Sequence, residues 1–281
     1  MSSATQTTST PEEALPFNPC NVLLDAKSLD MLIRQFLENY SFKDLNIFRN
    51  AFVHKSYCTR KNENFMQGNV QCPDGCLPLQ EESHERLEFL GDAVLNLIVG
   101  DYLFQRYPDE SEGFLTKLRT KLVNGNMLSE LAQYAHFSRF LIISKQIEEN
   151  NGRRNKKILE DTFEAFLAAL FIDAREQNLD SLAVVQEWFI NLIEQNIDFS
   201  ELIIQNNNYK DMFIKHAQYA FNYIPKFYEI NTETTTNSKV FRVAVKDKDG
   251  LIISTGTGVN KKQAENDAAY NALKLCGSLN V

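Results

Sequence analysis

The sequence has no long apolar run, no disulfide-like cysteine framework and no excess of positive charge. No hydrophobic stretch approaches the roughly 20 residues that a membrane-spanning helix needs. The N-terminal residues MSSATQTTSTPEEALPF lack the basic start and apolar core of a secretion signal. Five cysteines, an odd number without regular spacing, favour free thiols in a reducing compartment. These absences predict an intracellular protein, cytoplasmic or nuclear, without a membrane partner.

The shortage of positive charge is unevenly distributed. The net charge of −8 argues at first against a nucleic-acid partner. Residues 205–281, however, carry 10 basic and 7 acidic residues, whereas residues 1–204 carry 19 and 30. A slightly basic C-terminal part therefore follows a strongly acidic larger part. The acidic part can still act on a polyanion if its carboxylates hold divalent cations.

Hydrophobic periodicity predicts a helical N-terminal domain. Within residues 26–194, apolar residues recur three and four positions apart, most clearly in 114–122, 161–172 and 181–195. Residues 60–83 are polar and contain prolines and a glycine, which predicts a long irregular loop.

The spacing of the hydrophobic residues changes after the three asparagines at 206–208. A helix is expected at 209–220, strands at 226–232, 239–246 and 251–257, and a closing helix at 261–275. The chain is thus predicted to be an all-α domain plus a small α+β domain of α-β-β-β-α order. We expect a flexible tail at 1–25, the helical domain at 26–200, a linker at 201–208 and the α+β domain at 209–277.

Three acids share one face of a predicted helix. Glu85, Glu88 and Asp92 are spaced i, i+3 and i+7, so they fall within about 60° of one another at 100° per residue. They lie off the apolar stripe that includes Leu87 and Val94. A solvated acidic face is the simpler interpretation, but the like charges repel and bring a purely structural helix no advantage.

A second acidic pair, Asp161 and Glu164, stands on a helix that is otherwise almost wholly apolar. Carboxylates on such a buried helix cost several kcal/mol unless they are paired or metal-bound. The alternative is that they face solvent near the helix N-terminus, where the helix dipole favours acids. Taken together, the two acidic helices suggest one shared site for Mg²⁺ or Mn²⁺, because hard oxygen ligands suit these ions. By itself this pattern indicates only a metal-dependent phosphoryl-transfer enzyme.

Several motifs sharpen that interpretation. The run ERLEFLGDA at 85–93 resembles the ribonuclease III signature throughout its nine residues. Three further segments match the family in order and spacing: HKS at 54–56, EGFLTKLRTKLV at 112–123 and ILEDTFEA at 158–165. The resemblance covers about residues 32–275 and implies a helical ribonuclease III-type nuclease domain.

The resemblance also implies roles for single residues. Glu85 and Glu112 match additional acidic positions beside the scissile phosphate, and Phe89 matches a residue that packs across a homodimer interface. Two features depart from the family pattern: Glu160 stands where a small residue is common, and the 60–83 loop is long. The metal-ligand and catalytic quartet would be Glu88, Asp92, Asp161 and Glu164.

The implied reaction is hydrolysis of a phosphodiester by in-line attack of water. In this family Mg²⁺, for which Mn²⁺ can substitute, activates the water, and a second ion about 4 Å away stabilises the leaving 3′-oxygen. The products carry 5′-phosphate and 3′-hydroxyl ends. A two-fold dimer cuts both strands of double-stranded RNA and leaves short 3′ overhangs.

Residues 209–277 resemble a double-stranded-RNA-binding domain. The run KKQAENDAAYNAL at 261–273 matches the family pattern, and its alanines provide a small face that lets the helix lie close to the sheet. Lys261 and Lys262 sit at the helix N-terminus, where side-chain charge and helix dipole both attract phosphate. Taken alone, the pair could be an ordinary solvated helix start.

Other RNA contacts are less clear from the sequence. Lys210, Lys215 and Asn237 are candidate contacts. In the family that the domain resembles, Gln and Glu commonly reach the minor groove from the positions of Ile214 and Lys215, and a His is frequent at the position of Asn237. Recognition is therefore expected to rest on duplex shape, 2′-hydroxyls and phosphates, with little sequence preference.

Three alternatives stay open at this level. A protein that sequesters duplex RNA would explain the C-terminal domain but not the intact quartet. Cys72 and Cys76, with Cys58 and His84 in reach, could bind zinc, although their spacing is unusual for a zinc site. The basic residues within 153–157 are either a solvated loop or a contact to the RNA backbone.

Overall fold

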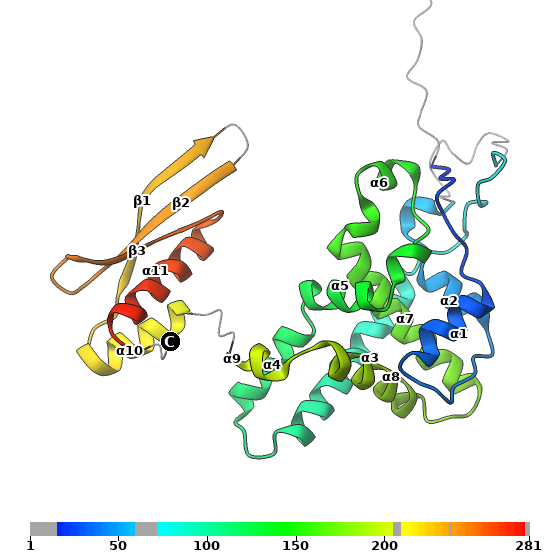
Figure 1. Ribbon diagram of the computed structural model, residues 1–281, viewed down its shortest axis with the longest axis horizontal. Helices are drawn as coiled ribbons and strands as arrows, with labels where there is room; N and C mark the ends of the chain where they lie inside the picture. The colour runs from blue at the N-terminus through cyan, green and yellow to red at the C-terminus, as the bar shows by residue number, and fades with distance from the viewer. Residues whose placement is uncertain (1–15, 60–71, 205–208, 236–237, 279–281) are drawn as a thin grey trace, which may run out of the picture. The chain divides into compact units, whose positions relative to one another are not determined.

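A computed structural model describes residues 16–59, 72–204, 209–235 and 238–278 of the chain (Figure 1). Asn237 and residues 60–71 of the predicted loop lie outside the described residues. The chain divides into two compact units, Met1–Asp198 and Phe199–Val281. Among the described helices, none combines the length and apolarity needed to cross a membrane.

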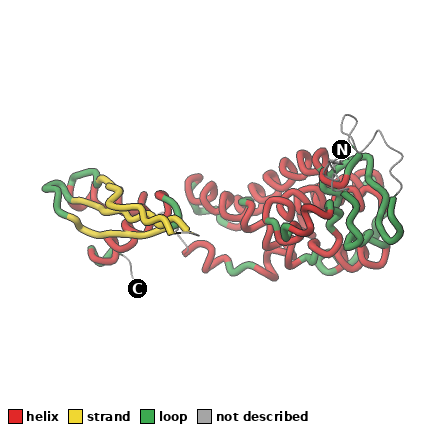
Figure 2. The backbone as a smooth tube through the Cα atoms, turned by 90° about the horizontal axis from the view of Figure 1, so that it is seen from above, coloured by secondary structure: helices red, strands yellow, loops and turns green. Residues whose placement is uncertain are grey.

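The first unit is helical (Figure 2). The helices predicted at 114–122, 161–172 and 181–195 are confirmed as α4, α7 and α8. Helix α7 begins earlier than predicted because the side chain of Asn155 caps it, accepting from the backbone N–H of Lys157 and Ile158. The helices are α1 Ala26–Arg34, α2 Leu45–Ala51, η1 Lys55–Tyr57, α3 Glu85–Arg106, α4 Glu112–Leu122, α5 Gly125–Tyr134, η3 Phe137–Phe140, α6 Lys145–Glu149, η4 Gly152–Arg154, α7 Lys156–Glu176 and α8 Ser181–Asn196.

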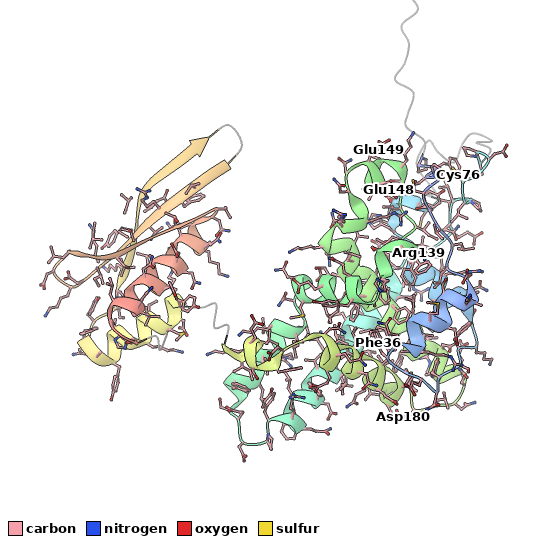
Figure 3. All side chains as sticks on the ribbon, in the orientation of Figure 1. Phe36, Cys76, Arg139, Glu148, Glu149 and Asp180 are labelled. Carbon is pink, nitrogen blue, oxygen red and sulfur yellow. The ribbon has the colours of Figure 1, made fainter. Side chains whose placement is uncertain are left out.

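Helix α7 forms the centre of this unit. It is apolar on nearly all sides and packs against α2, α3, α5 and α8. Trp188 of α8 is fully buried beside it, with its ring centroid 5.0 Å from that of Phe166. Phe36, labelled in Figure 3, meets Trp188 edge-on at 5.5 Å. The aromatic core fixes α7, and with it the acids near its N-terminus.

The segment before α1 is packed rather than loose. Phe17 and Leu24 are buried, and the side chain of Asn18 donates to the carbonyl of Ile143 at 3.1 Å. Arg153 donates to the carbonyl of Cys20 at 3.2 Å and pairs with Glu148, labelled in Figure 3, at 2.8 Å. Residues 17–25 of the predicted flexible tail are therefore part of the packed domain. Arg153, in the predicted basic cluster, is engaged in this packing through its contacts with backbone carbonyls and Glu148.

The second unit has the predicted α-β-β-β-α order. Its three strands form one antiparallel sheet in the order β1-β2-β3. Helix α9 occupies residues where a linker was expected to begin. The elements are α9 Phe199–Ile204, α10 Tyr209–Phe221, β1 Lys226–Thr235, β2 Ser238–Lys246, β3 Ile252–Gly258 and α11 Lys261–Leu275.

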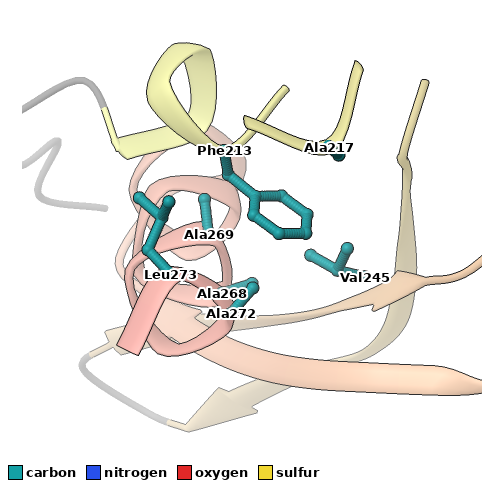
Figure 4. Packing of buried hydrophobic residues seen from close by; sticks show 7 residues of the cluster. All are labelled: Phe213, Ala217, Val245, Ala268, Ala269, Ala272 and Leu273. Atoms are coloured by element: carbon teal, nitrogen blue, oxygen red, sulfur yellow. The ribbon is translucent and has the colours of Figure 1, made fainter. Parts of the chain in front are cut away.

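Helix α11 lies directly on the sheet. A Cβ built on Gly256 would come within 2.0 Å of the backbone nitrogen of Ala268, so only glycine permits this approach. Ala264, Ala268 and Ala272 are fully buried, which confirms the small face predicted from the sequence. Figure 4 shows Phe213 of α10 in the same buried cluster as Ala268, Ala269 and Ala272 of α11. This packing holds the N-terminus of α11 in a defined position at the end of the sheet.

Candidate active site

The crossing of α3 and α7 brings the two acidic segments together. A Cβ built on Gly91 would lie 1.8 Å from the carbonyl oxygen of Glu164, so the two backbones approach as closely as glycine allows. Gly91 directly precedes Asp92 and follows Glu88 by three residues. This glycine thus sets the distance between the acids of α3 and those of α7, which are far apart in the chain.

Three carboxylates converge at this crossing. One oxygen each from Glu88, Asp161 and Glu164 lies within 4.8 Å of the other two. Two of them, Glu88 and Glu164, line an open hollow with a volume of about 440 Å³, whereas Asp161 is not one of its lining residues. Apart from Phe89, every residue that lines the hollow is charged: Glu85, Glu88, Asp92, Lys157, Glu160 and Glu164.

The electrostatics of the hollow favour a bound cation. Glu164 is only 7% exposed, and burial, followed by the charges of Asp92 and Glu160, raises its pKa to about 8. Burial also raises the pKa of Glu88, and the neighbouring Asp161 adds to the effect. Acids held near one another in this way lose their ionised form unless positive charge is supplied.

Lys157 supplies part of that charge. Its Nζ lies 2.6 Å from Asp161 Oδ1, 3.7 Å from Glu160 Oε2 and 3.9 Å from Glu88 Oε1. The side chain remains 64% exposed and lines the hollow. The sequence had left Lys157 open as either a solvated residue or an RNA-backbone contact. Its position one helical turn before Asp161 is the sequence signal that could have identified Lys157 as a residue of the acidic site.

The other predicted acids are placed less uniformly. Asp92 lines the hollow but is exposed, and its Oδ1 accepts from the side chain of Asn96 at 2.8 Å, outside the group of three. Glu85 lies at the rim and binds Lys55 at 3.2 Å. Glu112, at the start of α4, accepts from Thr116 at 2.8 Å and does not line the hollow.

The donor set fits a hard divalent cation. Glu88, Asp161 and Glu164 offer only carboxylate oxygens, which suit Mg²⁺ and Mn²⁺ better than softer metals. The predicted zinc alternative has no counterpart among the described residues, where Cys58, Cys72 and Cys76 pack against an apolar cluster. These carboxylates are therefore the residues that could hold a metal.

The second unit presents its predicted lysines in two different ways. Lys261 and Lys262 are exposed at the start of α11, where the side chain of Asn260 caps the helix. Lys261 is 3.9 Å from Glu229, a long contact that leaves it available. Lys210 is instead held 2.6 Å from Glu265, and Lys215 is paired with Asp211 of the same helix at 2.9 Å.

The sequence matches two family models. Residues 85–175 match the Ribonuclease III domain, and residues 209–275 match the Double-stranded RNA binding motif. The protein named "Ribonuclease 3" from Nitratiruptor sp. is 32% identical over 241 residues, which cover 86% of this chain and 94% of that protein. A mimivirus protein named "Probable ribonuclease 3" is 32% identical over 90% of this chain, which spans 46% of that longer protein.

A solved structure is also similar. The nuclease domain of ribonuclease III from Campylobacter jejuni shares 32% identity and a TM-score of 0.46, covering 59% of this chain and 96% of that one. The full-length relative and the two matching family models agree with the motifs and with the observed order of the two units. The chain therefore belongs to the ribonuclease III family, with a nuclease domain followed by a double-stranded-RNA-binding motif.

Proposed function

We propose that this protein is an endoribonuclease that hydrolyses double-stranded RNA with Mg²⁺, leaving 5′-phosphate and 3′-hydroxyl ends with short 3′ overhangs. The observation that carries the proposal is the convergence of Glu88, Asp161 and Glu164 at the crossing of α3 and α7. Clustered carboxylates repel RNA phosphates, so a protein that only bound RNA would gain nothing from them. They are useful when they hold cations.

The acids and the lysine at the hollow would have different roles in the reaction. Glu88, Asp161 and Glu164 would hold the divalent ion, with Asp92 as a fourth carboxylate at the same hollow. Such an ion, when bound, lowers the pKa of water and stabilises negative charge on the phosphate. The buried position of Glu164 keeps its carboxylate in one orientation, and the Lys157 ammonium offsets repulsion among the acids.

A homodimer is part of the proposal. Phe89, Leu97 and Phe104 of α3 are 82%, 57% and 71% exposed, and at 100° per residue they fall within an arc of about 80°. Large apolar side chains gathered on one helix face mark an interaction surface. A two-fold axis near Phe89 would repeat the hollow on the second strand of a duplex and allow one cut in each strand.

The second unit would supply affinity for the duplex. Lys261 and Lys262 at the N-terminus of α11 would bind phosphates, which carry no base information. Lys210 would contribute less, because its ammonium is already paired with Glu265. We therefore expect duplex RNA to be bound with little sequence preference.

Incubation of the full chain with long duplex RNA and Mg²⁺, followed by mapping of product ends, tests the proposal. Glu164→Gln and Asp92→Asn are expected to abolish cleavage and retain RNA binding, whereas Glu176→Gln on the exposed end of α7 should cleave normally. Full cleavage by Glu164→Gln would refute the metal-site assignment. Tight binding without cleavage by the unaltered protein would instead favour an RNA-sequestering function.

A further inference from the structure

His84 lies immediately before α3, one helical turn ahead of Glu88. Its backbone N–H donates to the carbonyl of Val53 at 2.8 Å, and its own carbonyl accepts from the N–H of Glu88 at 2.8 Å. The side chain is only 2% exposed. The ring is therefore buried in the protein next to Glu88, and it is not in contact with solvent.

Both ring nitrogens of His84 are buried without a hydrogen-bond partner among the described residues. Buried polar atoms in folded proteins nearly always have a partner, so an unpaired ring calls for an explanation. The neighbouring His54, by contrast, has its Nδ1 2.9 Å from the hydroxyl of Ser56. The Oε2 of Glu88 lies 3.7 Å from Nδ1, and the charges of Asp161 and Glu85 also act on the ring.

The two carboxylate oxygens of Glu88 face different neighbours. Oε2 lies toward the buried ring of His84, whereas Oε1 lies 3.9 Å from the Nζ of Lys157, which lines the open hollow. The Glu88 side chain is 27% exposed, between these two environments. One oxygen is thus positioned to accept a hydrogen bond from within the protein and the other to bind a ligand in the hollow.

We propose that His84 is a positioning residue whose Nδ1–H donates to Oε2 of Glu88, so that Oε1 is presented to the divalent cation. The present separation of 3.7 Å is longer than the usual N–H···O length of about 2.9 Å, so formation of this bond requires the Glu88 side chain to move toward the ring. A neutral imidazole has one donor and one acceptor, so donation from Nδ1 leaves Nε2 as the acceptor. This inference rests on the metal site proposed above.

Direct metal binding tests the role of His84. The probe is Mn²⁺, measured by electron paramagnetic resonance of the free ion with the full chain and no RNA. His84→Leu removes the donor and is expected to weaken Mn²⁺ binding about 10-fold, the usual effect of losing a partner of a ligand. His84→Asn keeps an N–H near the position of Nδ1 and should stay within about 3-fold of the unaltered protein. Unchanged binding by His84→Leu, or equal losses in both variants, would overturn the proposal.

Two further measurements separate this role from packing. In a Glu88→Gln background, His84→Leu should cause no further loss of Mn²⁺ affinity, because the effect passes through Glu88. An additive loss would overturn the proposal. Nitrogen NMR of the unaltered protein should show Nδ1 protonated and Nε2 not, and the opposite tautomer would equally overturn it. This measurement needs no variant, so it holds even if His84→Leu fails to fold.

Glu164→Gln serves as the reference in the Mn²⁺ titration. If this variant binds Mn²⁺ as the unaltered protein does, the metal site fails and the role of His84 fails with it. If it binds weakly while His84→Leu binds normally, only the inference about His84 fails. Weak binding by both, with rescue by His84→Asn, supports both.

Discussion

Gly91 of α3 lies so close to Glu164 of α7 that a Cβ at position 91 would be 1.8 Å from the Glu164 carbonyl oxygen. We expect Gly91→Ala to force the helices apart, lower the free energy of unfolding by about 2–4 kcal/mol and reduce cleavage more than 100-fold. Gly113→Ala in α4 is the matched control, since its Cβ would meet only Ser111 Oγ at 4.0 Å. Thermal unfolding and cleavage assays would measure the two losses. Equal effects of Gly91→Ala and Gly113→Ala would contradict the close crossing of α3 and α7 at Gly91.

The raised pKa of Glu164, about 8 instead of 4.5, links stability to pH in the absence of metal. Between these values the folded protein keeps a proton that the unfolded chain releases, so the free energy of unfolding falls as pH rises. Gln at this position has no such titration. In chelator at pH 8, we expect Glu164→Gln to raise Tm by roughly 5 °C, with little difference at pH 5. Glu176→Gln is the control, and a Tm difference that did not depend on pH would refute this linkage.

Lys157 should matter for turnover more than for RNA affinity. Its Nζ is 2.6 Å from Asp161 and faces the hollow, where it can stabilise charge on a phosphate. We expect Lys157→Met to lower kcat about 100-fold while RNA binding changes less than about 3-fold. Lys156→Met is the matched control, because its ammonium binds Asn126 instead. Single-turnover kinetics would measure the rate of cleavage of bound RNA. A near-normal rate in Lys157→Met would show that Lys157 has no role in the cleavage step.

The apolar face of α3 should hold two subunits together. We expect the double variant Phe89→Ser with Phe104→Ser to sediment as a monomer while the unaltered protein sediments as a dimer, because burial of these exposed rings drives association. Tyr134→Ser on α5, also exposed, is the control and should leave the dimer intact. A fully active monomer of the unaltered protein would contradict this assignment.

The lysines at the start of α11 should determine the salt dependence of RNA binding. Lys261→Ala with Lys262→Ala is expected to weaken binding at physiological salt about 10-fold or more and to lower the slope of log K against log salt by about 1–2. The loss should be equal across duplex sequences. The control removes the same charge elsewhere in the unit, by Lys248→Ala with Lys274→Ala. Unchanged affinity in the first variant would remove this helix from the RNA-binding surface.

The local features of this protein were predictable from its sequence. Apolar spacing identified α4, α7 and α8, and the change of period identified the second unit, because a helix or strand repeats over a few residues. The placement of Glu85, Glu88 and Asp92 on one helical face followed from the same geometry. The buried alanine face of α11 was visible as a spacing of four.

The relations between elements were decided only by the tertiary structure. Periodicity states which face of a helix is apolar but not which helix will lie against it or at what distance. The crossing at Gly91 therefore determined that Glu88, Asp161 and Glu164 converge while Glu112 stays apart. Packing also decided that Lys157 lines the acidic hollow and that Lys210 is paired with Glu265. It likewise placed the buried ring of His84 3.7 Å from the Glu88 carboxylate. The acidic hollow forms because α3 packs against α7, and the pairing of Lys210 with Glu265 forms because α10 packs against α11; these helices are far apart in the chain, so their contacts arise only in the folded core.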